Sequence, residues 1–217
     1  MSFKTVPLKG SKRKLLLNIE KRIKEVETKN VFDGFSGSGI VSAHLRSQGY
    51  KVYASDKMAS CNLFASVFLN GFDMRAVAKH VEHINWLAGS EGWITENYSG
   101  ERSRMIKGIK EIESRPLGFT RSNAMKLDVA RNYAELITND NDRNAVIFSI
   151  ILAMNKVFNN TNDQKSCLKN WTPAALSDIV FEIPTLVQGP KGKVYKGDII
   201  NVRKKNYDVV YLDPPYT

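Results

Sequence analysis

Apolar residues recur every three to four positions in several stretches of the chain, which is the spacing of an amphipathic helix. The first stretch, residues 12–28, carries charged residues on one side and these apolar residues on the other: Leu15, Leu16, Ile19, Ile23 and Val26. The same spacing predicts further helices over residues 60–70, 74–87, 102–114, 123–137 and 144–158. The middle of the chain is therefore predicted to be mainly helical.

Short apolar runs without helical spacing predict strands near both ends of the chain. Val31–Phe32 and Lys51–Ser55 are the first two, and Ile40–Gln48 between them is predicted to be a helix. Residues around Val194 and residues 208–212 predict two more strands. A strand, a turn, a helix and a second strand in succession form a β-turn-α-β unit, the layout of a nucleotide-type cofactor site. We therefore expect an α/β fold with a parallel sheet.

The order of these elements predicts three parts of the chain. Residues 1–58 carry the first strands and the expected cofactor site, and residues 59–170 form a long, mainly helical insertion. Residues 171–217 return to the sheet with short extended runs and turns. Regular strands thus flank a helical region that interrupts them.

Composition narrows the class of protein. Lys and Arg outnumber Asp and Glu by 32 to 22, a formal net charge of +10, which favours a polyanionic partner such as nucleic acid. Cys61 and Cys167 stand far apart, so we expect no disulfide framework and a reducing compartment. The longest apolar stretch, Ala145–Met154, is too short to span a bilayer, and residues 1–14 lack a signal-peptide core. We expect an intracellular soluble protein without a membrane partner.

A glycine-rich turn follows the first strand. Gly34, Gly37 and Gly39 stand between a strand and a helix, where backbone N–H groups approach a ligand closely and the helix end favours negative charge. Asp56 ends the next strand, the position from which a carboxylate accepts both ribose hydroxyls of a nucleotide. The alternative is that Asp56 is a surface acid that ends a strand.

The last strand leads into Asp213, Pro214, Pro215 and Tyr216. In an open α/β sheet, ligands bind at the carboxyl ends of the strands, so this segment is expected beside the glycine turn. The prolines stiffen the loop, which presents the Asp213 carboxylate, the Pro214 carbonyl and an aromatic ring. Two acceptors and a stacking surface suit an exocyclic aromatic amine such as adenine N6. The alternative, a Pro-Pro strand terminator, explains the prolines alone.

These motifs resemble those of the S-adenosylmethionine-dependent DNA methyltransferases that methylate amino groups, specifically the adenine-N6 enzymes of restriction–modification systems. "FDGFSGSG" and "PLKGSKRKLL" resemble their two cofactor motifs, "GDI" resembles the segment that contacts the cofactor's adenine, and "DPPY" matches their catalytic motif at all four positions. The resemblance assigns S-adenosylmethionine to Gly10, Ser11, Lys12, Asp33, Phe35, Ser36, Gly37, Gly39, Asp56, Asp198 and Ile199. It assigns catalysis to Asp213, Pro214, Pro215 and Tyr216.

The resemblance also implies a fold and a substrate. We expect a Rossmann-like class I methyltransferase sheet and the transfer of a methyl group to a flipped-out adenine in a specific sequence of double-stranded DNA, with residues 59–170 as the DNA-recognition region. Candidate phosphate contacts are Arg102, Arg104, Lys107, Arg121 and the lysines of "KVYKGD". Such enzymes continue past the catalytic motif with further strands, so we expect a missing carboxyl-terminal portion or a second chain that completes the sheet. The expected location is the bacterial cytoplasm, at the nucleoid.

Two other interpretations of the function stay open. One is an RNA adenine or guanine methyltransferase, since Asp-Pro-Pro with an aromatic also serves such enzymes. The other is a non-catalytic subunit that binds DNA or cofactor and is completed by another chain. His80 and His83 have metal-ligand spacing, but no third ligand is evident and methyl transfer needs no metal, so we expect none. Trp86 and Trp93 are expected to be packing residues.

Overall fold

The computed structural model describes residues 3–8, 10–106, 109–114, 118–160, 167–201 and 207–214. The chain forms two compact units, one from Met1–Met74 with Pro184–Thr217 and the other from Arg75–Ile183. The chain thus passes between units after Met74 and after Ile183, whereas the sequence pattern placed its boundaries after residues 58 and 170. The role of the middle region in DNA recognition remains a prediction.

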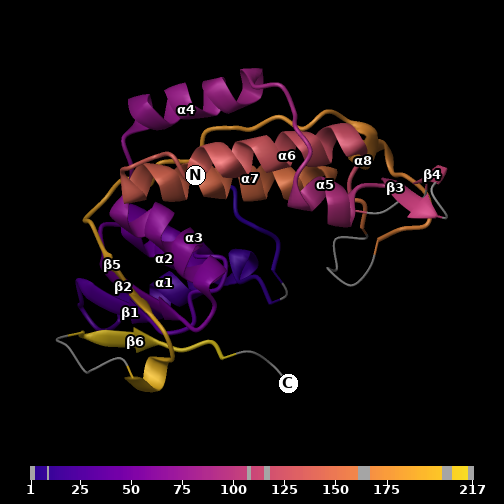
Figure 1. Ribbon diagram of the computed structural model, residues 1–217. Coiled ribbons are helices and arrows are strands. Elements are labelled where there is room, and N and C mark those ends of the chain that lie inside the picture. The colour runs from indigo at the N-terminus through magenta and orange to yellow at the C-terminus, as the bar shows by residue number, and fades with distance from the viewer. Residues whose placement is uncertain are drawn as a thin grey trace. The chain divides into compact units, whose positions relative to one another are not determined.

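The first unit contains a four-stranded parallel sheet (Figure 1). Its strands stand in the order β5 (Lys193–Lys196), β2 (Lys51–Asp56), β1 (Asn30–Asp33) and β6 (Val209–Tyr211). In the register of the central pairs, Val31 lies opposite both Val52 and Val209. The α/β class with a parallel sheet is therefore confirmed, as are the strands expected near residues 194 and 208–212.

Helices of the first unit follow the predicted pattern closely. The short 3-10 helix η1 (Arg13–Leu15) continues into α1 (Leu16–Lys24), while α2 (Ile40–Ser47) and α3 (Ala59–Asn70) both contact β2. Burial of large apolar side chains supplies most of the stabilising free energy of such a core. The fully buried residues on these elements include Val31, Val52, Leu45, Phe68 and Leu69.

The second unit is mainly helical, as expected. Its helices are α4 (Met74–Trp86), α5 (Trp93–Tyr98), α6 (Arg121–Ala134), α7 (Asp140–Val157) and α8 (Pro173–Leu176). Helix α6 begins where the Thr120 hydroxyl accepts a hydrogen bond from Asn123 N, and α7 where the Asn139 side chain accepts from Asn141 N and Asp142 N. Among the residues described, no helix is both long and apolar enough to cross a membrane.

The helix predicted over residues 102–114 is wrong. This stretch contains two antiparallel strands, β3 (Glu101–Ile106) and β4 (Ile109–Ser114). Their register places Arg102 opposite Glu113 and Arg104 opposite Glu111. Two residues separate the strands, the second of them Gly108, which is a hairpin signal. The three-to-four spacing of the apolar residues had predicted a helix in place of this hairpin.

Three asparagines hold the irregular segment that leads back to the sheet. Asn85 exchanges two hydrogen bonds with the backbone of Phe181, at 2.9 and 3.0 Å. The Asn123 side chain donates a hydrogen bond to the Ser177 carbonyl and accepts one from Ile179 N. The Asn159 side chain accepts a hydrogen bond from Thr172 N. Buried backbone without a sheet partner needs such side chains to satisfy its polar groups. The segment therefore has a defined course without regular secondary structure.

Candidate functional site

The glycine-rich turn is joined to the ends of both neighbouring strands. Gly34 N donates to the Tyr211 carbonyl of β6 (3.0 Å), and Ser36 N donates to the Ser55 carbonyl of β2 (3.1 Å). Because β1, β2 and β6 are parallel, their carboxyl ends meet at this edge, as expected for an open α/β sheet. The turn thus lies between the two predicted motifs, at Asp56 and at Asp213.

Two glycines of this turn have backbone conformations that other residues rarely adopt. Gly37 and Gly39 have φ values of +50° and +74°. A side chain at Gly39 would meet the ring of Phe68 at 2.9 Å, so this glycine permits close packing of the turn on α3. At Gly37, the nearest atom to an added Cβ is the Phe35 carbonyl oxygen at 3.9 Å. The backbone at Gly37 is therefore accessible to a ligand, and that at Gly39 is packed.

Asp33 lies beneath the turn as a buried acid. Its side chain accepts a hydrogen bond from the Ser42 hydroxyl of α2 (2.7 Å), and the residue is 1 % exposed. Burial, with smaller contributions from the neighbouring carboxylates of Asp56 and Asp213, raises the pKa of Asp33 to about 6, against the opposing effect of the Ser42 hydrogen bond. Asp33 thus joins β1 to α2, and its pKa depends on the charges of Asp56 and Asp213.

Asp56 joins the glycine turn to the loop that follows β2. Its Oδ2 accepts from Gly37 N (2.9 Å), and its Oδ1 accepts from Met58 N (2.9 Å). A carboxylate has about four acceptor positions, so these two bonds leave capacity for hydroxyl donors from a ligand. The ribose role of Asp56 stays a prediction, while its contact with the glycine turn adds a structural role.

Lys12 and Asp213 form an ion pair between the two ends of the chain. The Lys12 ammonium lies 2.6 Å from Asp213 Oδ2 and also donates to the Gly10 carbonyl (2.9 Å). The two side chains are 14 % and 20 % exposed, so the pair is largely shielded from water. The structure therefore brings together an expected cofactor residue and the expected catalytic acid, which the sequence placed in separate motifs.

The "GDI" segment reaches the same edge of the sheet. Gly197 N donates to the Asp56 carbonyl (3.2 Å), and Ser55 Oγ donates to the Gly197 carbonyl (3.2 Å). Asp198 Oδ1 accepts from Ile200 N (3.1 Å), and the side chain of Ile199, in η2 (Ile199–Asn201), packs against Gly34. These contacts place both residues near the glycine turn.

The remaining predicted site residues are less constrained. Pro214 is described, whereas Pro215 and Tyr216 lie outside the described residues. Phe35 is half-buried, Gly10 and Ser11 are exposed, and Ser36 is buried. The Ser36 hydroxyl has no hydrogen-bond partner among the described residues, which marks it as a donor that a ligand or water would satisfy.

One residue at this edge has no counterpart in the sequence prediction. Asn62, near the start of α3, donates to the carbonyls of Asp56 (2.8 Å) and Met58 (3.1 Å) and is buried. It fixes the loop that follows β2, where the Asp56 carboxylate lies. The only sequence signal was a polar residue on a helix that is otherwise apolar at this point.

The candidate metal ligands in the second unit have other contacts. His80 Nδ1 lies 2.8 Å from the Tyr133 hydroxyl, and the His83 ring packs against the Tyr133 ring at 4.8 Å. Among the described residues, no three side chains of His, Cys, Asp or Glu are arranged to hold a metal.

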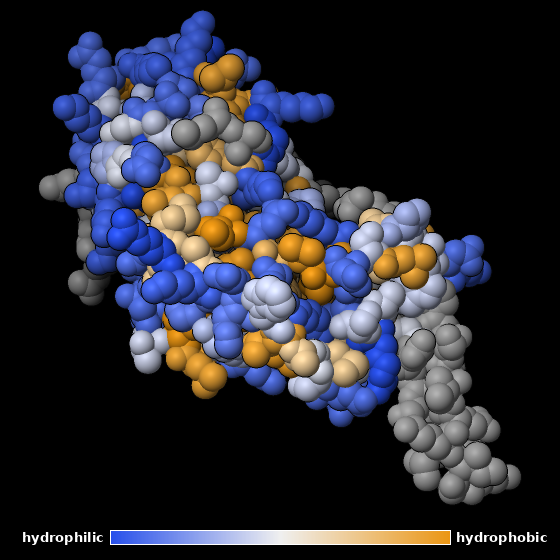
Figure 2. Space-filling view, turned by 90° about the horizontal axis from the view of Figure 1, so that it is seen from above, coloured by the Kyte–Doolittle hydropathy of each residue, from blue (hydrophilic) through white to orange (hydrophobic). Residues whose placement is uncertain are grey.

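The two tryptophans expected to pack are exposed, and that prediction was wrong. Trp86 and Trp93 are 83 % and 64 % exposed. The face drawn in Figure 2 shows apolar side chains interspersed among polar ones. Trp93 lies on the six-residue helix α5, where it contacts Tyr98 at 5.4 Å between ring centroids, so it packs against another partly exposed ring and not into the core.

Comparison with known proteins agrees with the arrangement of these motifs. The chain matches the family model described as D12 class N6 adenine-specific DNA methyltransferase over residues 9–217. It is 27 % identical over 221 residues to the Modification methylase StsI of Streptococcus sanguinis, with 95 % of this chain and 33 % of that protein covered. The chain therefore spans about a third of the length of this curated relative. No solved structure matches it significantly.

Proposed function

This chain belongs to the D12 class N6 adenine-specific DNA methyltransferases, and we propose that it transfers a methyl group from S-adenosylmethionine to N6 of an adenine in duplex DNA. Its biological role would be that of the modification enzyme of a restriction–modification system, acting at the DNA in the bacterial cytoplasm. The observation that carries the proposal is the Asp213 carboxylate, held by Lys12 at the carboxyl end of β6 and beside the glycine turn.

The residues around the turn fit the proposed cofactor. The Asp56 carboxylate suits two adjacent ribose hydroxyls, an added side chain at Gly37 would meet no atom closer than 3.9 Å, and the Ser36 hydroxyl lacks a described partner. Asp198 and Ile199 stand at the same edge and are assigned to the adenine end. When bound, S-adenosylmethionine supplies a methyl group on a positively charged sulfur, open to attack by a nitrogen lone pair.

Asp213 and Pro214 act on the amine that receives the methyl group. The lone pair of an aromatic amine is delocalised into its ring, which makes the nitrogen a poor nucleophile. Hydrogen bonds accepted from both amino hydrogens, by the Asp213 carboxylate and the Pro214 carbonyl, favour a tetrahedral nitrogen and localise the lone pair. Lys12 fixes the carboxylate, and such preorganisation matters because a displacement of about 1 Å costs about a hundredfold in rate.

The DNA partner must present a single base to this edge. A base inside a duplex cannot reach a loop at the end of a strand, so the proposal requires that the adenine be flipped out. Its unstacking is offset by stacking on Tyr216 and by phosphate contacts of basic residues, with Arg102 and Arg104 of β3 as candidates. The net charge of +10 supports a polyanionic partner.

We also propose that the free edge of β6 pairs with a further strand, from a longer protein or a second chain. Among the described residues, β6 pairs with β1 and with no other strand, and Val210 and Leu212 are more than half exposed. Parallel sheets are normally covered on both faces, and an exposed apolar edge promotes association. A partner strand would pair with the free backbone groups of this edge.

The test of the proposed reaction is the Asp213→Ala variant. We expect methyl transfer to duplex DNA to be lost while S-adenosylmethionine affinity, measured by calorimetry, stays nearly unchanged, because the acid contacts the amine and not the donor. Asp213→Asn is the milder control, since its amide oxygen still accepts one hydrogen bond. Turnover of Asp213→Ala within about tenfold of the parent enzyme would exclude this role for the acid.

A further inference from the structure

Helix α1 is attached to its unit by few buried residues. Although its apolar residues predicted an amphipathic helix, Glu20 and Ile23 are the buried ones among its nine residues. Leu17 is 75 % exposed. A surface helix is usually held by an apolar stripe. In α1, one of the two buried residues is the acid Glu20. The contacts of its carboxylate therefore contribute unusually strongly to the position of the helix.

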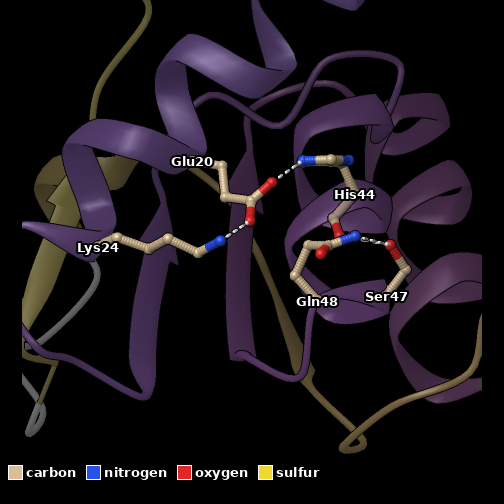
Figure 3. Close-up of polar contacts among 5 residues, drawn as sticks. All are labelled: Glu20, Lys24, His44, Ser47 and Gln48. Carbon is tan, nitrogen blue, oxygen red and sulfur yellow. Dashed lines mark hydrogen bonds and ion pairs between the residues drawn. The ribbon is translucent and has the colours of Figure 1, made fainter.

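The Glu20 carboxylate joins α1 to α2 (Figure 3). Its Oε2 lies 2.8 Å from Nε2 of His44 in α2, and its Oε1 lies 2.5 Å from the Lys24 ammonium within α1. The Glu20 and His44 side chains are almost fully buried, whereas Lys24 is largely exposed. The contact between the helices is therefore shielded from water, and the contact within α1 is at the surface.

The ionisation of Glu20 determines which residue donates the hydrogen bond between Glu20 and His44. The hydrogen bond with Lys24 lowers the pKa of Glu20, and that with His44 acts in the same direction, although burial opposes both. An ionised carboxylate can only accept, so His44 Nε2 carries the hydrogen and donates it. A buried bond of this kind is costly to break, because it leaves a carboxylate without its partner in a dry environment.

The two helices that Glu20 and His44 join begin at the candidate site. Helix α1 continues directly from η1, which follows Lys12, and α2 begins just after Gly39 of the glycine turn. Within η1, the Arg13 guanidinium donates to the Phe3 carbonyl at 2.7 Å. The segment that carries Lys12 is thus held by the contact of Arg13 with Phe3 and by the contact of α1 with α2.

We propose that Glu20 is a positioning residue, which holds α1 against α2 through His44 and thereby keeps the Lys12 ammonium beside Asp213. Glu20 contacts neither DNA nor the methyl donor in this role. The inference rests on the proposed function for its effect on catalysis, but the placement of Lys12 is a property of the folded chain and can be measured without turnover.

The first experiment measures how fast Lys12 reacts with an amine-acylating reagent, by mass spectrometry of the full chain. Glu20→Ala removes both contacts, Glu20→Gln keeps an acceptor for His44, and His44→Ala breaks the same link from α2 if Glu20→Ala fails to fold. Asp213→Ala calibrates the assay, because it removes the carboxylate beside Lys12. Glu25→Ala is the matched control, since Glu25 forms an exposed ion pair with Arg22 at the end of the same helix.

We expect Glu20→Ala and His44→Ala to raise the acylation rate of Lys12 toward that of Asp213→Ala, with Glu20→Gln and the control near the parent rate. In kinetics, kcat should fall about tenfold or more in the two alanine variants, with the KM for DNA within about twofold. Parent-like protection of Lys12 in both alanine variants overturns the inference, as does equal deprotection by Glu20→Gln and Glu20→Ala. A parent enzyme without methyl transfer contradicts the proposed function, and the acylation result then still decides the placement of Lys12.

Discussion

The buried acid beneath the glycine turn allows a quantitative test of the site. Burial raises the pKa of Asp33 from its ordinary value of 3.8 to about 6. Between about pH 4 and pH 6 the unfolded chain releases this proton while the folded chain retains it, so the free energy of unfolding falls as the pH rises. Above about pH 7 both states are ionised and the loss is complete. One unit of pKa corresponds to about 1.4 kcal/mol, so the total loss is about 3 kcal/mol.

Asp33→Asn removes this titration while it keeps an acceptor for the Ser42 hydroxyl. Relative to the parent protein, the variant should therefore be more stable at pH 8 than at pH 4, by about 3 kcal/mol. Comparing the two pH values cancels any constant cost of placing an amide in the core. Urea unfolding at a series of pH values measures the difference, and Asp73→Asn, an exposed site in the same unit, is the control. A stability difference that stays constant from pH 4 to pH 8 would refute the reasoning.

Two further predictions concern the residues around the turn. Asp56→Ala should weaken S-adenosylmethionine binding by about 1–3 kcal/mol, since it leaves hydrogen-bond donors unpaired; unchanged affinity in calorimetry would make Asp56 a purely structural acid. Gly39→Ala should lower the free energy of unfolding by about 1–2 kcal/mol from the left-handed backbone alone, with more from contact with Phe68. Gly37→Ala shares the positive φ but meets only an ordinary contact with the Phe35 carbonyl oxygen, so a variant as unstable as Gly39→Ala in urea unfolding would contradict the role of Phe68.

Local pattern alone determined the elements that form the site. The strand at Val31–Phe32, the helix from Ile40 and the strand ending at Asp56 were predicted within a residue or two. Each of these depends on short-range rules, namely apolar periodicity and the freedom of glycine to adopt positive φ. The position of Asp213 after a strand followed from the same rules, and parallel topology then brought it to the edge that carries the glycine turn.

The tertiary structure decided what depends on residues far apart in the sequence. No local pattern places the Lys12 ammonium on Asp213, or aims Glu20 of an amphipathic helix at His44. Periodicity also failed for residues 102–114, because apolar spacing compatible with a helix was overridden by the pairing of two strands. Propensity acts within a few residues, whereas burial and pairing depend on which surfaces the fold brings together. The fold and the site's elements are therefore readable from the sequence, and the contacts that orient its charged groups are set by packing.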